Sequence, residues 1–166
     1  MRIFLTGKAR VGKSTVLAKT IEILRKRRLK IGGIVTPEIC EGRRVGFAVF
    51  DVATRKKGIL ASIKLKTGPR LGKYRIDVDG FEAIALPALD LAIRECDIVI
   101  IDEIGKMEFF SEKFKQKLQE VLESDKPLIA VVHRNFVEKF RKYGRVIEVA
   151  KENREDLPKE IVKIMI

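Results

Sequence analysis

The sequence has no tryptophan and only two cysteines among its 166 residues. Cys40 and Cys96 lie far apart and belong to no C-x-x-C motif, which excludes a disulfide framework and a cysteine metal site and favours a reducing compartment. No run of 18 apolar residues occurs, and the apolar stretch 1–6 is too short for a signal peptide. We therefore expect a cytoplasmic protein with no membrane partner.

Acidic side chains are outnumbered, with 35 Lys and Arg against 23 Asp and Glu, and the net charge is +12. This charge favours anionic partners, either nucleic acid or small phosphorylated molecules. Hydrophobic residues make up 46% of the chain, which excludes wholesale disorder, and the length is that of one domain. Glutamine and asparagine are scarce while lysine, glutamate and isoleucine are abundant, a bias typical of proteins from hot environments.

Strand-like and helix-like patterns alternate along residues 1–166, which we interpret as a single domain. The expected strands are 2–6, 31–36, 43–52, 58–65, 74–78, 98–101, 128–132 and 145–149. The expected helices are 14–29, 81–95, 111–122, 136–142 and 157–166. Residues 38–66 form a hairpin-like antiparallel insertion, and Pro87 either kinks its helix or begins a second one. The alternation predicts an α/β fold of three layers around a mostly parallel sheet.

A phosphate-binding loop directly follows the first expected strand. Residues 7–14 read Gly-Lys-Ala-Arg-Val-Gly-Lys-Ser, which fits G-x-x-x-x-G-K-[ST] between a strand and a helix. The glycines let backbone N–H groups surround phosphate oxygens, Lys13 reaches the β- and γ-phosphates, and Ser14 offers its hydroxyl to Mg²⁺. The predicted nucleotide-binding residues of this loop are Gly7, Lys8, Ala9, Arg10, Val11, Gly12, Lys13, Ser14 and Thr15.

Two basic side chains within this loop have open roles. Lys8 and Arg10 either fold over the γ-phosphate, as an arginine finger supplied by the same chain, or point to solvent and raise the local potential. A residue with a Cβ at position 10 also risks a positive φ, which costs about 1–3 kcal/mol.

Two neighbouring acids follow the most apolar expected strand. Asp102 comes directly after four β-branched residues, where a Mg²⁺-holding carboxylate of a phosphate-loop protein is expected. Glu103 is next, and it either polarises the attacking water or faces solvent. We predict Ser14 and Asp102 as metal-holding residues and Lys13 and Glu103 as catalytic residues.

Several later side chains are weaker candidates. Lys106 either touches phosphate or pairs with Glu103 or Glu108. His133, the only histidine, follows the strand 128–132 and is either a γ-phosphate sensor or structural. Arg134 is a second candidate for stabilising transition-state charge.

The chain resembles the small nucleoside-triphosphatases first described from thermophiles, whose human relative is called cancer-related nucleoside-triphosphatase. The resemblance covers nearly the whole sequence. Its landmarks are 3–7 with 11–15, 32–33 through 37–38, 42–47, Tyr74, 81–82 with 85–87, 101–108 and 151–154. The runs Asp102–Glu108 and Lys151–Arg154 are more specific than a general phosphate loop. At 8–10 the sequence has Lys-Ala-Arg where the family usually has Pro-Pro-Gly.

This resemblance implies a RecA-like phosphate-loop fold and Mg²⁺-dependent hydrolysis of ATP, GTP, CTP, UTP and TTP, with diphosphates as weaker substrates. It also implies nucleotide contacts along a second segment, Ile98, Val99, Ile100, Ile101, Asp102, Glu103, Ile104 and Gly105. In the run 151–154, Asn153 and Arg154 either contact base or ribose, or Asn153 caps the terminal helix.

Two other functions fit parts of the sequence. In a small-molecule or nucleotide kinase, the insertion 38–66 would cover an acceptor, clamped by Arg43, Arg44 and Arg55. A nucleic-acid-binding ATPase agrees with the net charge, but the charges alternate in sign along the expected helices and no known nucleic-acid-binding motif occurs, so we do not favour it.

Overall fold

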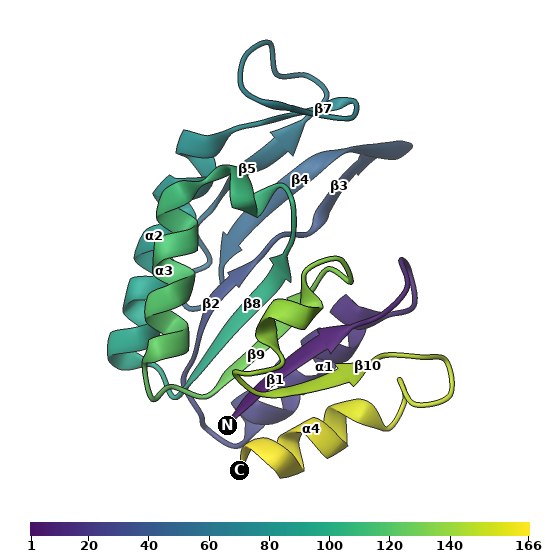
Figure 1. Ribbon diagram of the computed structural model, residues 1–166, viewed down its shortest axis with the longest axis vertical. Helices are drawn as coiled ribbons and strands as arrows, with labels where there is room; N and C mark the ends of the chain where they lie inside the picture. Colours follow the sequence, from purple (N-terminus) through teal and green to yellow (C-terminus); the bar gives the residue numbers. More distant parts are fainter.

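One ten-stranded sheet runs through the computed structural model, which describes residues 1–166 (Figure 1). Its strands are β1 (Arg2–Thr6), β2 (Ile31–Val35), β3 (Glu38–Glu41), β4 (Arg43–Asp51), β5 (Lys57–Ser62), β6 (Arg70–Leu71), β7 (Tyr74–Ile76), β8 (Ile98–Ile104), β9 (Leu128–Val132) and β10 (Arg145–Glu148). The helices are α1 (Lys13–Lys26), α2 (Val78–Glu95), α3 (Glu112–Glu123) and α4 (Leu157–Met165), with 3₁₀ turns η1 (Glu108–Phe110) and η2 (Val137–Phe140). None of these helices is long and apolar enough to cross a membrane.

The strand order is β10-β1-β9-β8-β2-β4-β5-β7-β6, with β3 paired to β4. The first five strands in this order are parallel, whereas every pairing from β4 onward is antiparallel. The predicted mostly parallel sheet with an antiparallel excursion is therefore confirmed. Residues 38–66 contain the three strands β3, β4 and β5, one more than a hairpin. Because the parallel strands all end at one edge, the loops after β1, β2, β8, β9 and β10 meet there.

Alternate side chains of the parallel strands enter two separate apolar cores. Ile3 and Leu5 of β1 pack with α1 and α4, whereas Phe4 between them packs with α2, α3 and η2. The same alternation runs through β8, where Ile98 and Ile100 share the first core and Val99 and Ile101 the second. Both faces of these strands are covered, as a fully apolar run in a parallel strand indicates. The three predicted layers are confirmed.

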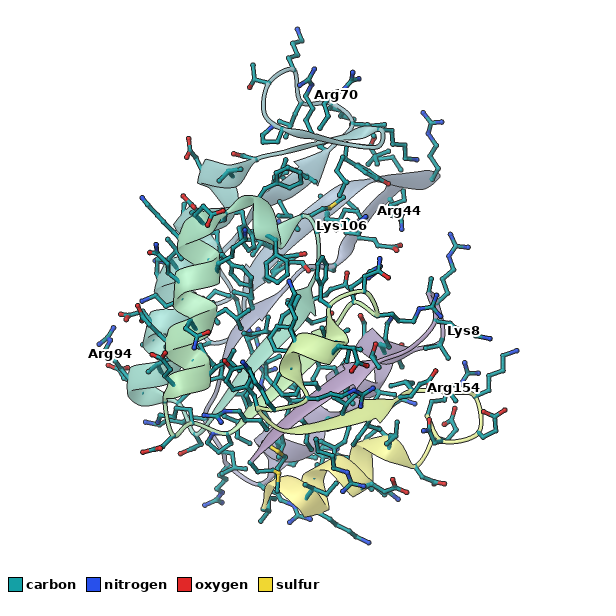
Figure 2. The ribbon with its side chains drawn as sticks, viewed as in Figure 1. Lys8, Arg44, Arg70, Arg94, Lys106 and Arg154 are labelled. Carbon is teal, nitrogen blue, oxygen red and sulfur yellow. The ribbon has the colours of Figure 1, made fainter.

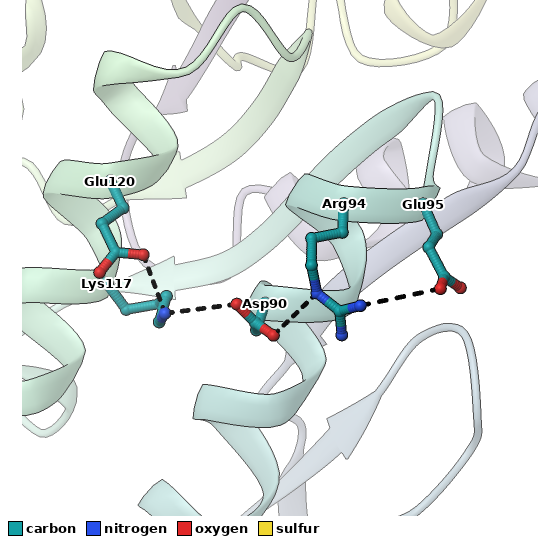
Figure 3. Close-up of polar contacts among 5 residues, drawn as sticks. All are labelled: Asp90, Arg94, Glu95, Lys117 and Glu120. Carbon is teal, nitrogen blue, oxygen red and sulfur yellow. Dashed lines mark hydrogen bonds and ion pairs between the residues drawn. The ribbon is translucent and has the colours of Figure 1, made fainter.

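Helices α2 and α3 lie side by side on one face and are joined by one ion pair, between Asp90 and Lys117 (Figure 3). Asp90 accepts from Arg94 of its own helix at 3.0 Å and lies 3.6 Å from the ammonium of Lys117 on α3. Asp90 and Arg94 are about half exposed and Lys117 less so, and pairs this close to solvent add little stability beyond the packing underneath. Pro87 lies inside the single helix α2, so the alternative of a second helix beginning there was wrong.

Two predicted boundaries differ at the loop edge of the sheet. Strand β8 does not end at Ile101 but continues through both acids to Ile104, with a register shift against β9 between Asp102 and Ile104. The predicted helix 136–142 is only the 3₁₀ turn η2. A bulge is invisible to hydrophobic patterning, because it adds a residue to the strand without changing which side chains are apolar.

Candidate active site

The predicted phosphate loop connects β1 to α1 at the edge where the parallel strands end. Gly7 has φ +148° and Gly12 has φ +112°, conformations that side chains rarely adopt. A Cβ on Gly7 would lie 2.8 Å from the carbonyl oxygen of Val149, so the loop passes too close to the β10 segment for any other residue. Helix α1 begins at Lys13 with no side-chain cap and no acid in its first turn. Its leading N–H groups and positive dipole end therefore suit an anion.

The basic side chains of this loop are arranged unequally. Lys13 donates to the carbonyl oxygen of Gly7 at 2.8 Å, which folds its ammonium across the loop. Arg10 has φ +62°, the positive torsion anticipated at this position, at a cost of about 1–3 kcal/mol. Lys8 and Arg10 are exposed and make no ion pair. Lys8 and Arg154 are both labelled on the right-hand side of Figure 2.

The structure brings Asp102 of β8 to the start of α1. The pKa of Asp102 is raised to about 6, chiefly by burial and also by the negative charge of Glu103. A hydrogen bond from the Ser14 hydroxyl and the charge of Lys13 act in the opposite direction. The two predicted metal-holding side chains are therefore in contact, although they are 88 positions apart in the chain and β9 lies between β8 and the strand β1 that precedes α1.

Thr36, just after β2, holds the backbone that joins the two acids. Its backbone N–H and its hydroxyl both donate to the carbonyl oxygen of Asp102, at 2.6 and 2.8 Å, and the N–H of Glu103 donates to the same hydroxyl at 3.0 Å. Sequence reasoning missed this residue. The signal that could have identified Thr36 is its position, because it is a polar residue directly after an apolar strand that runs parallel to β8.

Glu108 was also missed, except as a possible partner for Lys106. Its side chain is buried, and that burial together with the charges of Glu103 and Asp102 raises its pKa to about 8. The carboxylates of Glu103 and Glu108 both lie close to Gly105. A Cβ on Gly105 would lie 3.1 Å from Oε1 of Glu103 and 3.2 Å from Oε1 of Glu108. A neutral acid therefore lies beside the predicted water-activating carboxylate at pH 7.

The weaker candidates occupy the same edge without forming the predicted ion pairs. Lys106 is exposed and pairs with neither Glu103 nor Glu108, so those two alternatives were wrong. His133 follows β9, where its N–H donates to the carbonyl oxygen of Ile104 and its Nδ1 accepts from Asn135. Arg134 is exposed and makes no ion pair.

The run 151–154 lies against the phosphate loop. Arg154 donates to the carbonyl oxygen of Val11 at 3.1 Å, and its Cδ would be 3.5 Å from a Cβ on Gly12. Asn153 accepts from the N–H of Ala150 at 2.8 Å and donates to the carbonyl oxygen of Glu148 at 2.9 Å. The alternative that Asn153 caps the terminal helix was wrong, because α4 has Asp156 at its N-cap.

The predicted segment 98–105 divides into two parts. The side chains of Ile98, Val99, Ile100 and Ile101 fill the two cores and do not reach the loop edge. The part of the segment at that edge begins with Asp102. Val11, Ala9 and Thr15 lie in the phosphate loop or at the start of α1, as their position in the motif requires.

The donors at this edge fit a magnesium ion. No group of three or more His, Cys, Asp or Glu side chains gathers to form a closed metal cage. Asp102 and Ser14 instead offer one carboxylate and one hydroxyl beside the phosphate loop. Mg²⁺ is commonly held by one or two carboxylates together with substrate phosphates and waters, so this sparse oxygen set is what it needs.

Known proteins match this chain over nearly its whole length. A family model described as NTPase matches residues 2–162. The nucleoside-triphosphatase THEP1 of Methanosarcina acetivorans is 50% identical over 97% of this chain and 94% of its own length. The crystal structure of THEP1 from Aquifex aeolicus superposes with a TM-score of 0.88 at 32% identity, covering 99% of each chain. The solution structure of a human cancer-related nucleoside triphosphatase gives a TM-score of 0.81 at 33% identity, covering 98% of this chain and 96% of that one.

Proposed function

This chain belongs to the NTPase family and is a nucleoside-triphosphatase, and from that premise we propose how its residues carry out the hydrolysis. The predicted family resemblance and the α/β phosphate-loop fold are confirmed. The proposal concerns the metal, the range of substrates and the roles of individual side chains. We also propose that residues 1–166 act as one domain, because the sheet is continuous from β10 to β6.

We assign triphosphate binding to the loop 7–15 and Mg²⁺ to Ser14 and Asp102. The observation that carries this assignment is the contact of Asp102 with Ser14 beside Lys13 at the start of α1. When bound, Mg²⁺ would neutralise phosphate charge and orient the β- and γ-phosphates. Lys13, which bonds to the oxygen of Gly7 in this structure, would turn to the phosphates, because an anionic oxygen is a stronger acceptor than a carbonyl.

Glu103 orients the attacking water for in-line displacement at the γ-phosphorus. Support comes from Thr36, whose hydroxyl bonds to the carbonyl oxygen of Asp102 and to the N–H of Glu103 and so holds the backbone that joins them. The two carboxylates therefore start from adjacent, fixed backbone positions, and we assign Asp102 to the metal and Glu103 to the water. Hydrolysis breaks the bond between the γ-phosphorus and the β–γ bridging oxygen, and the water oxygen forms the new bond to phosphorus. Glu103 accepts one proton of the attacking water and releases it after the reaction, the second proton stays on the phosphate product, and the nucleoside diphosphate leaves with the electrons of the broken bond.

Broad tolerance for the base agrees with the contacts of the run 151–154. Both ends of the Asn153 amide bond to the backbone of their own loop, and Arg154 bonds to the phosphate loop. These bonds hold both side chains against the protein backbone, and we infer that neither turns to read a base edge. We propose that ATP, GTP, CTP, UTP and TTP are all hydrolysed, and diphosphates more slowly because they offer the loop one phosphate fewer.

Phosphate release from each of the five triphosphates, and from ADP, tests this proposal. With Mg²⁺ and no acceptor, the rates should agree within about tenfold among the triphosphates, and EDTA should abolish them. Lys13→Ala should lose both nucleotide binding and turnover. Strong selectivity for one base, or full turnover in EDTA, would contradict the proposal.

The kinase alternative has little support. Family membership favours water as the acceptor, and one of the three arginines of the expected clamp is already engaged, because Arg44 donates to the Tyr74 hydroxyl at 2.8 Å and pairs with Glu38 at 3.2 Å. Release of phosphate without an added acceptor separates the two reactions directly.

A further inference from the structure

Two adjoining grooves lie along the junction of η1, α3 and η2, on the face of the sheet opposite α1 and α4. Their volumes are about 600 and 510 Å³, and both are lined by Phe109, Lys115 and Lys139. We call the residues Lys106, Phe109, Phe110, Lys115, Phe136 and Lys139 the Lys–Phe surface. Nothing in the proposed hydrolysis uses it, apart from Lys106 at its border with the active site.

The charge of this surface is almost entirely positive. Lys115 pairs with Glu112 of its own helix at 3.0 Å, whereas Lys106 and Lys139 are exposed and form no ion pair, and the same is true of Lys142 in the adjoining groove. Glu138 is the only acid lining either groove, and Arg141 pairs with it at 2.9 Å. Lysines without acidic partners attract an anion, and several in a row attract an extended polyanion.

Aromatic rings lie between these lysines. Phe110 is 38% exposed, which is unusual for so large an apolar side chain next to a charged groove. Behind it the rings of Phe109 and Phe136 pack edge-to-face at 4.9 Å, and the ammonium groups of Lys115 and Lys139 lie 5.9 and 5.4 Å from those rings. The surface therefore offers flat apolar rings and cations in alternation.

We propose that the Lys–Phe surface binds single-stranded nucleic acid, with phosphates on its lysines and bases stacked against Phe110 and its neighbours. A strand is the polyanion that also carries stackable rings, and grooves of this kind are typical of proteins that bind strands without sequence preference. An acidic polypeptide would use the lysines but leave the rings without partners. In a duplex the base faces are stacked on one another, so they could not stack on Phe110.

Fluorescence anisotropy with labelled oligo(dT) and oligo(U) of about 12 nucleotides, with no nucleoside triphosphate present, tests the proposal independently of hydrolysis. Reversing two unpaired lysines, K139E with K142E, should weaken binding at least about tenfold and reduce the salt slope by about 1.4. The matched control reverses two exposed, unpaired lysines of α4 on the opposite face, K159E with K163E, and should weaken binding no more than about twofold.

A second pair of variants tests stacking without changing charge. Phe110→Ala should weaken binding about fivefold or more, the lower range of base stacking, whereas Ile59→Ala, which removes an apolar side chain of equal 38% exposure on β5, should have no effect. Triphosphate hydrolysis should stay at the wild-type rate in all four variants, which shows that they fold.

Three results would overturn the proposal. If K159E with K163E weakened nucleic-acid binding as much as K139E with K142E does, binding would follow the net charge alone. Unchanged affinity in Phe110→Ala would remove the role of stacking. Competition by polyglutamate or by duplex DNA as effective as that of oligo(dT) would assign the surface to a different partner.

Discussion

The buried acid Glu108 makes the stability of this protein depend on pH in a predictable direction. Its pKa is raised from the ordinary 4.5 to about 8, chiefly by burial and then by the charges of Glu103 and Asp102. Between these two values the folded state holds a proton that the unfolded state has released. Stability therefore falls as pH rises from about 4.5 toward 8, because folding must recover that proton.

Substitution of Glu108 by glutamine should remove this dependence. The amide has the shape of the protonated acid and carries no charge at any pH, so the variant and the wild type should be about equally stable below pH 4.5. The difference between the two pKa values corresponds to about 5 kcal/mol once the pH is well above 8, and to about 3 kcal/mol at pH 7. In both cases the glutamine variant is the more stable protein.

Denaturant unfolding of both proteins from pH 4 to pH 9, plotted as the difference in unfolding free energy, isolates Glu108 and its coupling to neighbouring acids, because titrations that are the same in both proteins cancel. The difference should be near zero at the acid end and rise steadily through neutral pH. A difference that does not change with pH would refute the reasoning, and so would a wild type that gains stability relative to the variant as pH rises.

Three further perturbations follow from the contacts of the loop edge and of α3. Thr36→Val removes the hydroxyl that holds the two acids, so turnover should fall about tenfold or more with KM changed less than about twofold, whereas Thr36→Ser should restore most of the rate; equal rates for the two variants would argue against this role. Gly7→Ala places a Cβ 2.8 Å from the carbonyl oxygen of Val149, so equilibrium binding of a fluorescent nucleotide should weaken at least about tenfold, and wild-type affinity would be a contradiction. Ser111→Ala deletes the cap that accepts from the N–H of Phe114 at 3.0 Å and should cost about 1–2 kcal/mol in denaturant unfolding, an effect that an unchanged midpoint would exclude.

The fold could be predicted because its local signals agree with one another. Short strand-like runs, most of them next to a glycine or proline, predicted every parallel strand, and Ser111 is the N-cap of α3 as predicted. Elements that depend on partners elsewhere could not be predicted. Strand β3 is mostly exposed and pairs only with β4, and β6 has two residues, so neither has a hydrophobic pattern of its own.

The same distinction applies to the site. The motif at 7–15 and the pair Asp102 and Glu103 could be found because spacing along the chain specifies them. Thr36 and Glu108 act through three-dimensional neighbours, since one bonds to β8 from β2 and the other is buried behind Gly105. The contact of Arg154 with Val11 spans 143 positions, and no local pattern indicates it.

The assignment of Glu103 to the attacking water is tested most directly by the rate of phosphate release from Glu103→Gln at saturating Mg²⁺ and ATP. Glu112→Gln, at an exposed position of α3, is the matched control. We predict ATP affinity within a few-fold of wild type and a loss of phosphate release of about 100-fold or more, because the amide keeps the shape but cannot accept the water proton. A Glu103→Gln variant that releases phosphate as fast as the wild type or the Glu112→Gln control would contradict the account.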